Sequence, residues 1–209
     1  MSASSNEHRQ PELVESILDP DPVRQFHRWF AEATAAGVPQ PNAMTLATAT
    51  PDGRPSARVV LLKNADGEGF KFFTNYTSRK GRELAANPFA ALVFHWEELG
   101  RQVRVEGPVE RLSAQESDTY FASRPPDNRR SSLASAQSEE ATREELDARF
   151  EALKQQYAEG PVPRPDYWGG YRVRPARMEF WQRRFARLND RILYRRTPEN
   201  LWSITRLAP

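Results

Sequence analysis

The chain has 209 residues, 38% of them hydrophobic and 28% charged, which is enough for one substantial core and favours a single domain. Its formal net charge of +2 argues against nucleic acid as a partner, and the lack of cysteine excludes disulfides, thiol catalysis and cysteine-ligated metals. The three histidines show no metal-ligand spacing, and we find neither a secretory signal nor an apolar run of about 20 residues, so we expect a cytosolic protein with no metal and no membrane anchor.

The chain opens with a polar stretch, residues 1–20, which predicts a mobile arm in front of one domain over residues 21–209. Asp21 followed by a proline is a typical helix start, because Asp caps the helix and proline fits its first turn. Phe26 and Trp29 then recur at helical spacing. We predict a helix whose aromatic side chains pack into the core.

Three strands with short connections follow this helix. Residues 43–50, 56–63 and 70–75 are short segments rich in Thr, Val and Phe, which favour strands. Turn-forming residues separate them at 51–54 and 64–69. The pattern predicts a β-meander.

The second of these strands carries a cation at each end of an apolar run, Arg58 before it and Lys63 after it. The run itself predicts a buried strand, in which an unpaired charge would be costly. Side chains alternate along a strand, so two residues five apart point to opposite faces. One strand would then offer cations to two anionic groups. The ordinary alternative is that both side chains extend from the strand ends into solvent.

A basic helix start comes next along the chain. Ser78 can cap a helix over 81–87, and Arg79 and Lys80 fall in its first turn, where the helix dipole favours acids. Nothing in the neighbouring sequence compensates for this conflict. A bound anion would remove it, because backbone N–H groups and both cations would converge on the anion. We therefore predict an anion site here rather than a solvated basic turn.

Two more strands, over 89–96 and 102–112, bring the total to five and predict a closed or nearly closed antiparallel barrel, in an α+β fold that is mainly β. The rest of the chain predicts, in order, a helix capped by Ser113 and Glu116, an irregular segment at 124–138, a charged helix at 139–158, and three late strands, one each over 171–182, 192–196 and 201–206.

A series of short motifs runs through the chain after about residue 20: RVVLLK (58–63), FFTNYTSRK (72–80), GRQVRVEG (100–107), YFASRP (120–125), AQS (136–138), WGGYRV (168–173), EFWQ (179–182), RLNDR (187–191) and RLAP (206–209). In this order and spacing they resemble the FMN-dependent pyridoxine/pyridoxamine 5′-phosphate oxidases. The resemblance implies an antiparallel split β-barrel with flanking helices, in an obligate homodimer with two FMN sites at the subunit interface.

The resemblance also implies a cofactor site. Arg58, Arg79 and Lys80 would bind the FMN phosphate, at the anion site that the basic helix start predicts. The remaining contacts would come from Val59, Val60, Leu61, Leu62, Lys63, Phe73, Thr74, Gln102, Gln137, Ser138, Trp181 and Arg191. These residue types fit, since amides hydrogen-bond flavin carbonyls, tryptophan covers apolar ring surface, and arginine favours a reduced, anionic flavin. The ordinary alternatives are core packing for Trp181 and an ion pair for Arg191.

The substrate phosphate would, by the same resemblance, be bound by Lys63, Tyr120 and Arg124. Tyr120 and Arg124 are one helical turn apart and can face the same way. A point cation, a hydroxyl and a planar guanidinium together suit a phosphate group. The remaining substrate contacts would be Asn128, Arg187 and Asn189, and the last two, beside the reacting ring, are the catalytic candidates.

Three departures from the family pattern fall on the substrate side. Asn189 stands where the family's RLHDR motif has a histidine, and asparagine cannot carry a proton charge near neutral pH. Asn128 stands where a serine or glycine is expected, and residues 183–186 are bulkier and more basic than the usual glycine-led loop. The flavin side is kept, so FMN is the firmer expectation and the substrate the weaker one.

The resemblance implies that pyridoxamine or pyridoxine 5′-phosphate is oxidised to pyridoxal 5′-phosphate, with dioxygen reduced to hydrogen peroxide. One alternative is an FMN oxidase of another, phenazine-like aromatic compound, although Lys63, Tyr120 and Arg124 argue for a phosphorylated substrate. The other is a non-catalytic protein that binds flavin or pyridoxal phosphate.

Overall fold

The computed structural model of the protein describes residues 12–209. Its helices are α1 (Pro22–Ala35), α2 (Arg79–Ala86), α3 (Ala114–Ser123), α4 (Pro126–Ala134) and α5 (Arg143–Gln156). Its strands are β1 (Ala43–Ala49), β2 (Pro55–Leu61), β3 (Asn64–Asp66), β4 (Gly69–Asn75), β5 (Phe89–Trp96), β6 (Arg101–Arg111), β7 (Trp168–Val173), β8 (Arg177–Gln182), β9 (Asp190–Arg196) and β10 (Trp202–Arg206). Short 3₁₀ turns are found at η1 (Glu15–Ile17), η2 (Glu97–Leu99) and η3 (Phe185–Arg187).

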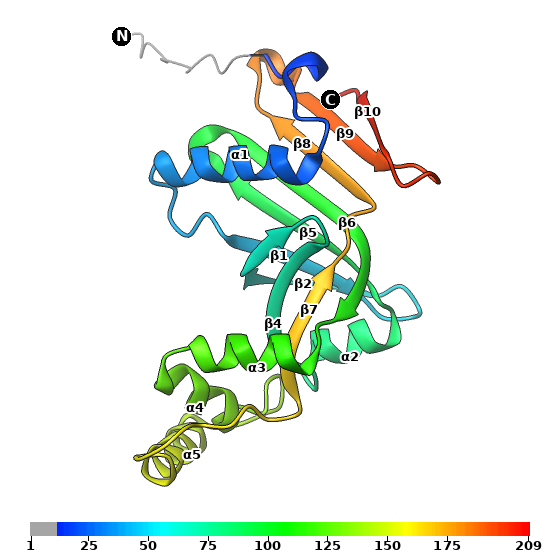
Figure 1. Ribbon diagram of the computed structural model, residues 1–209. Helices are drawn as coiled ribbons and strands as arrows, with labels where there is room; N and C mark the ends of the chain where they lie inside the picture. Colours follow the sequence, from blue (N-terminus) through cyan, green and yellow to red (C-terminus); the bar gives the residue numbers. More distant parts are fainter. Residues whose placement is uncertain (1–11) are drawn as a thin grey trace.

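All strand pairs are antiparallel, in the order β10-β9-β8-β6-β5-β1-β2, with β7, β4 and β3 branching from β6. Strand β6 belongs to both branches, because Arg101–Glu106 pair with β8 whereas Val109–Arg111 pair with β7. Gly107 lies between the two stretches, and a Cβ there would come within 1.9 Å of the Arg174 carbonyl oxygen. Only glycine permits this approach. The result is the expected split barrel (Figure 1).

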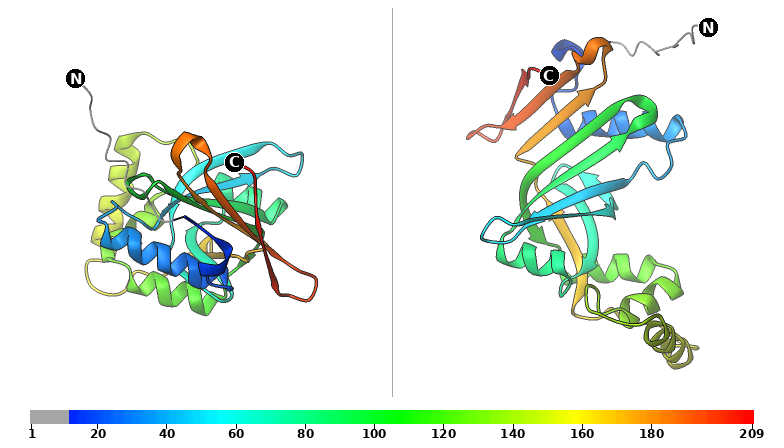
Figure 2. Two further views of the ribbon diagram at one scale, coloured as in Figure 1. Left: turned by 90° about the horizontal axis from the view of Figure 1, so that it is seen from above. Right: turned by 180° about the vertical axis from the view of Figure 1, so that it is seen from behind.

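Helix α1 covers one face of the sheet, while α3, α4 and α5 gather at the opposite end of the molecule, beyond β4 and β7 (Figures 1 and 2). Asp21 caps α1 as predicted, accepting a hydrogen bond from the Val23 backbone at 2.8 Å. Phe26 contacts Phe94 at a ring-centroid distance of 4.9 Å, and Trp29 contacts Phe180 at 5.1 Å. The predicted packing of the helix aromatics into the core is confirmed.

The predicted arm lies partly outside the described residues, since residues 1–11 are not among them. Its described part, residues 12–20, lies against the domain. Leu13 and Leu18 are buried in the main core cluster, and the Tyr194 hydroxyl donates to the Asp19 carbonyl at 2.8 Å. The packed domain therefore begins before residue 21, because Leu13 and Leu18 bury apolar surface in its core.

Three local predictions are wrong. The segment 124–138 is not irregular but contains α4, which starts with a proline at its first turn. The strand predicted over 171–182 is two strands, β7 and β8. The apolar run at 59–62 is not a buried strand: its first three residues end the edge strand β2, which pairs with β1 alone within residues 12–209, and Val59 is 68% exposed.

Candidate functional site

A cavity of about 1030 Å³ opens between strands β2 and β4 and helices α2, α3 and α4. Most of the residues predicted to bind cofactor or substrate line it: Arg58, Val59, Val60, Leu61, Lys63, Phe73, Thr74, Arg79, Lys80, Tyr120, Arg124, Asn128, Gln137 and Ser138. They come from segments far apart in the sequence. The fold therefore gathers cations, aromatic rings and amides around one space.

Lys80 is the most deeply placed cation of this cavity, with 8% of the residue exposed. Its Nζ donates to Gln137 Oε1 at 3.0 Å, to Thr74 Oγ1 at 3.2 Å and to Ser78 Oγ at 3.4 Å. Within residues 12–209, no carboxylate lies within ion-pair distance of it. Burial, assisted by the charge of Arg58, lowers the pKa of Lys80 from 10.5 to about 8. An anion in the cavity would stabilise this ammonium, because all of its present partners are neutral.

The two neighbouring arginines share a buried carboxylate, Glu83. Its Oε1 accepts from Arg79 Nε at 2.9 Å, and its Oε2 lies 3.4 Å from Arg58 Nη2. The prediction that the basic helix start has no compensation is therefore wrong for Arg79, because Glu83 lies one helical turn later and pairs with it. The first backbone N–H of α2, from Arg79, donates to Ser138 Oγ at 3.1 Å.

The opposite end of the cavity carries Lys63, Tyr120 and Arg124. The Tyr120 ring stacks on Phe73 at a centroid distance of 3.9 Å, and Lys63 Nζ lies 5.9 Å from the Tyr120 ring centre. Arg124 Nη1 donates to Ser132 Oγ at 2.7 Å, and burial lowers the pKa of its guanidinium. Neither cation pairs with a carboxylate in the described part of the chain. This end also suits an anionic group.

The prediction that Arg58 and Lys63 serve opposite faces is wrong. Strand β2 ends at Leu61, and the chain turns before Lys63, so the alternation of the strand does not extend to it. Both cations line the same cavity. Leu62, which was predicted to contact the cofactor, is instead 7% exposed and belongs to the core cluster.

Two family models match the chain. The model described as "Pyridoxamine 5'-phosphate oxidase" matches residues 30–182, and the one described as "Pyridoxine 5'-phosphate oxidase C-terminal dimerisation region" matches residues 168–209. A pyridoxine/pyridoxamine 5′-phosphate oxidase from Rubrobacter xylanophilus is 57% identical over 97% of this chain and 94% of its own length. One from Cupriavidus taiwanensis is 58% identical over 94% of this chain and 93% of its own.

The chain belongs to the pyridoxamine 5′-phosphate oxidase family.

Two solved structures have a similar fold. PhzG from Burkholderia lata, in complex with tetrahydrophenazine-1-carboxylic acid, superposes with a TM-score of 0.89 at 37% identity, over 95% of this chain and 98% of that one. An FMN-binding protein related to pyridoxamine 5′-phosphate oxidase, from Nostoc punctiforme, has a TM-score of 0.75 at 17% identity over 92% of this chain and 100% of that one, and shows the fold alone. The split barrel expected from the sequence is confirmed.

Besides Leu62, three residues of the predicted cofactor site do not line the cavity of their own chain. Gln102, Trp181 and Arg191 form a row across β6, β8 and β9, because each is the register partner of the next. Arg191 makes a two-bond ion pair with the buried Glu179, at 2.8 and 3.2 Å, so the ion pair considered as its ordinary role is present. Both β8 and β9 lie within the family's dimerisation region.

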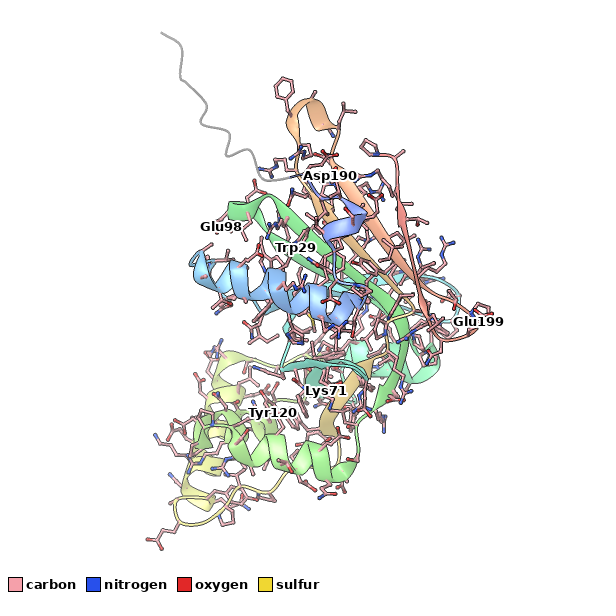
Figure 3. The ribbon with its side chains drawn as sticks, turned by 45° about the horizontal axis from the view of Figure 1, so that its top comes forward. Trp29, Lys71, Glu98, Tyr120, Asp190 and Glu199 are labelled. Carbon is pink, nitrogen blue, oxygen red and sulfur yellow. The ribbon has the colours of Figure 1, made fainter. Side chains whose placement is uncertain are left out.

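The two catalytic candidates, Arg187 and Asn189, also lie outside the cavity, on the connection between β8 and β9. Figure 3 shows the neighbouring Asp190 at one end of the molecule and Tyr120 at the other. Arg187 is exposed and has a positive φ of 63°, which is uncommon for a residue with a side chain. Asn189 Oδ1 accepts from the Arg184 backbone at 2.9 Å. Within one subunit, Asn189 therefore stabilises the loop between β8 and β9.

Sequence reasoning missed two parts of the site. Trp168 lines the cavity and stacks at 5.6 Å on Phe73, but its motif was used only for the family resemblance. Glu83 was missed, although its spacing of four from Arg79 on a predicted helix is a signal for an ion pair.

Two further properties concern the described residues as a whole. None of the helices within residues 12–209 combines the length and the apolar character that crossing a membrane requires. In the same part of the chain, His, Asp and Glu side chains do not cluster in groups of three that could hold a metal ion.

Proposed function

We propose that the protein is an FMN-dependent oxidase that converts pyridoxamine 5′-phosphate or pyridoxine 5′-phosphate to pyridoxal 5′-phosphate, with dioxygen as electron acceptor and hydrogen peroxide as product. The observation that carries this proposal is Lys80, a buried ammonium with neutral partners that faces a large cavity. The relative from Rubrobacter xylanophilus, which is 57% identical over 94% of its own length, is named for this activity, and this similarity supports the proposal.

The donor set fits FMN. Arg58, Arg79 and Lys80 would hold its phosphate, since three cations at one end of the cavity complement a phosphate dianion. Thr74 and Gln137, which already meet at 3.0 Å, would stand beside it. The chemistry that FMN supplies when bound is two-electron oxidation of the substrate carbon that bears the 4′ amine or alcohol, with dioxygen as the final acceptor.

The second cationic end fits the substrate phosphate. Lys63 and Arg124 have no carboxylate partner within residues 12–209. Tyr120, whose ring stacks on Phe73, adds a hydroxyl group to the same cavity. A phosphorylated pyridine held there would lie in the same cavity as the flavin. The role of these residues is to bind and orient the substrate, because holding two reactants in a productive geometry lowers the barrier.

A homodimer would complete the site. Gln102, Trp181 and Arg191, together with Arg187 and Asn189, lie on a part of the sheet that overlaps the dimerisation region, away from the cavity of their own chain. We propose that they reach the cavity of the partner subunit and contact flavin and substrate there. We further place the protein in the cytoplasm, where FMN and phosphorylated vitamers are available.

One assay tests the proposal. Purified protein is incubated with FMN and pyridoxamine 5′-phosphate under air, and pyridoxal 5′-phosphate and hydrogen peroxide are measured together. We expect both products in equal amounts, and none without FMN. Protein that binds FMN but oxidises neither vitamer would contradict the proposed substrate. Protein that cannot be loaded with FMN would contradict the proposal as a whole.

A second candidate is oxidation of a phenazine-like acid, favoured by the 37% identical PhzG that was solved with tetrahydrophenazine-1-carboxylic acid. The phosphate-binding end formed by Lys63, Tyr120 and Arg124 speaks for the phosphorylated pyridine, because a ligand without a phosphate has no use for both cations. A direct comparison of kcat/KM for the two compounds decides between them, and we expect pyridoxamine 5′-phosphate to be preferred.

A further inference from the structure

Glu83 is a buried carboxylate that pairs with two of the cations lining the cavity, Arg58 and Arg79. Only 5% of its side chain is exposed. Its Oε2 accepts from Thr48 Oγ1 at 2.5 Å and from Ser56 Oγ at 2.6 Å, and its Oε1 accepts from Arg79 Nε at 2.9 Å. Arg58 Nη2 is the fourth donor, at 3.4 Å from Oε2. One carboxylate thus links β1, β2 and α2.

The same hydroxyls also hold Arg58. Its Nη1 donates to Thr48 Oγ1 at 2.6 Å and to the Leu46 carbonyl at 3.2 Å, and its Nη2 donates to Ser56 Oγ. Glu83 therefore fixes this guanidinium both directly and through Thr48 and Ser56. The side chain of Arg79 is 60% exposed, and Glu83 fixes it through its Nε. Within residues 12–209, its terminal amino groups are left for another acceptor.

A carboxylate in this position opposes a phosphate by charge alone. Like charges repel, and the repulsion is stronger in a partly buried site than in water. The charge of Glu83 therefore lowers the affinity for a phosphate unless its contacts with the two arginines raise that affinity by more. Three cations and one carboxylate leave two positive charges, which balance a phosphate dianion without an excess.

We propose that Glu83 is a positioning residue of the phosphate site: it holds the guanidinium groups of Arg58 and Arg79 in the orientation that binds the FMN phosphate. The inference deepens the proposed function and rests on it. Side chains held in place before a ligand arrives lose less conformational freedom on binding, and arginine has much to lose. The ordering of both arginines thereby adds to affinity more than the carboxylate takes away.

The ionisation of Glu83 is consistent with this role. Burial alone would raise its pKa, but the hydrogen bonds from Ser56, Thr48 and Arg79 and the charge of Arg58 lower the pKa to about 2. The carboxylate is therefore charged at neutral pH and can accept all four of these bonds.

The test is Glu83→Gln, measured by titration with FMN and with riboflavin, which lacks the phosphate. Glu83→Gln removes the negative charge that opposes the phosphate. It also replaces one carboxylate oxygen, which accepts hydrogen bonds, with an NH₂ group, which cannot accept them. Electrostatics alone predicts tighter FMN binding, whereas loss of positioning predicts weaker binding. We expect the dissociation constant for FMN to rise about tenfold, because buried donors lose their acceptor, and that for riboflavin to stay within about twofold.

Two further variants control for charge and for folding. Glu139→Gln removes a carboxylate that pairs with Arg82, another arginine of α2. Within residues 12–209, Glu139 forms no ion pair with Arg58 or Arg79. It should leave the FMN dissociation constant within about twofold. Glu83→Asp keeps the charge but is one methylene too short to reach both the strand hydroxyls and Arg79, so it should weaken FMN binding as well. It serves in place of Glu83→Gln if that variant does not fold.

The outcomes separate this inference from the function it rests on. Wild-type protein that fails to bind FMN would contradict the proposed function. Wild-type protein that binds FMN, with Glu83→Gln binding it equally or more tightly, would overturn the positioning role alone. So would an equal loss of FMN and riboflavin affinity, because a residue that merely joins α2 to the sheet has no reason to distinguish the phosphate.

Discussion

The two cationic ends of the cavity are built differently. At the α2 end, Arg58 and Arg79 pair with Glu83, and Lys80 donates to Gln137 and Thr74. At the α3 end, Lys63 and Arg124 have aromatic and hydroxyl neighbours but no carboxylate among residues 12–209. The first arrangement suits a group that stays bound, and the second suits one that must enter and leave at each turnover.

The largest effect should follow from a change at the α2 end. Lys80→Met removes a buried charge whose present partners are neutral, so the phosphate loses its most desolvated cation. We expect FMN affinity to fall about 100-fold, because a charge-assisted bond in a buried site contributes up to about 3 kcal/mol. Fluorescence titration measures it. The exposed Lys154→Met on α5 is the control, and an unchanged affinity at Lys80 would refute the assignment.

A change at the α3 end should separate substrate from cofactor. Arg124→Ala should raise the KM for pyridoxamine 5′-phosphate about 30-fold while FMN affinity stays within about twofold, because the guanidinium lies over Trp168 and donates to Ser132 rather than to Glu83. Steady-state kinetics with saturating FMN provides both values. Arg143→Ala, on the exposed face of α5, is the matched control. If FMN binding and KM changed together, the two ends would not be separate sites.

The pH dependence of FMN binding should reveal Lys80. Its pKa of about 8 lies below the ordinary 10.5, so the lysine loses its charge as the pH rises through 8 unless an anion is bound. We expect FMN affinity to drop about tenfold between pH 7 and pH 9, and Lys80→Met to abolish the drop.

The same shift has a consequence for stability without FMN. The unfolded chain holds the Lys80 proton up to about pH 10.5 whereas the folded chain releases it near pH 8, so the contribution of Lys80 to stability becomes more favourable as the pH rises between these values. Denaturant unfolding of wild type and Lys80→Met at pH 7 and pH 9.5 measures it. A contribution of the opposite sign would mean that Lys80 is not buried as described.

The smallest effect should come from Asn128, which lines the cavity and is proposed to contact the substrate. Its backbone carbonyl accepts from Ser131 and Ser132, a role that Asn128→Ser preserves, so only the side chain in the cavity changes. We expect KM for either vitamer to change by less than about threefold. A change above tenfold would place the asparagine side chain directly on the substrate phosphate.

The sequence predicts well which cations line the cavity, because each of them lies in a short segment with a recognisable pattern. The helix capped by Ser78 and the strand before Lys63 can each be recognised from a few residues, and the family motifs supply their spatial relation. Glu83 was accessible by its spacing from Arg79. The contact with Thr48 and Ser56 was not, since it depends on how α2 packs on two strands.

Other features needed the fold. The four apolar residues after Arg58 look like a buried strand, but an edge strand has the same composition when another surface covers it. Helix α4 lacks an apolar stripe, so periodicity gave no sign of it, and only Pro125–Pro126 marked a start. The distance between Tyr120 and Asp190 follows from the path of β6 through both branches of the sheet, which no short motif encodes.

The seclusion of Lys80 has a consequence for the protein in a cell. A ligand that binds only the folded form raises its stability by mass action, and the gain grows with the tightness of binding, to which the buried Lys80 contributes. When flavin is scarce, a greater share of the molecules would unfold and be degraded by proteases, since small losses of stability change abundance several-fold. The amount of enzyme would then follow the vitamin supply with no dedicated regulator, and one lysine would link the two.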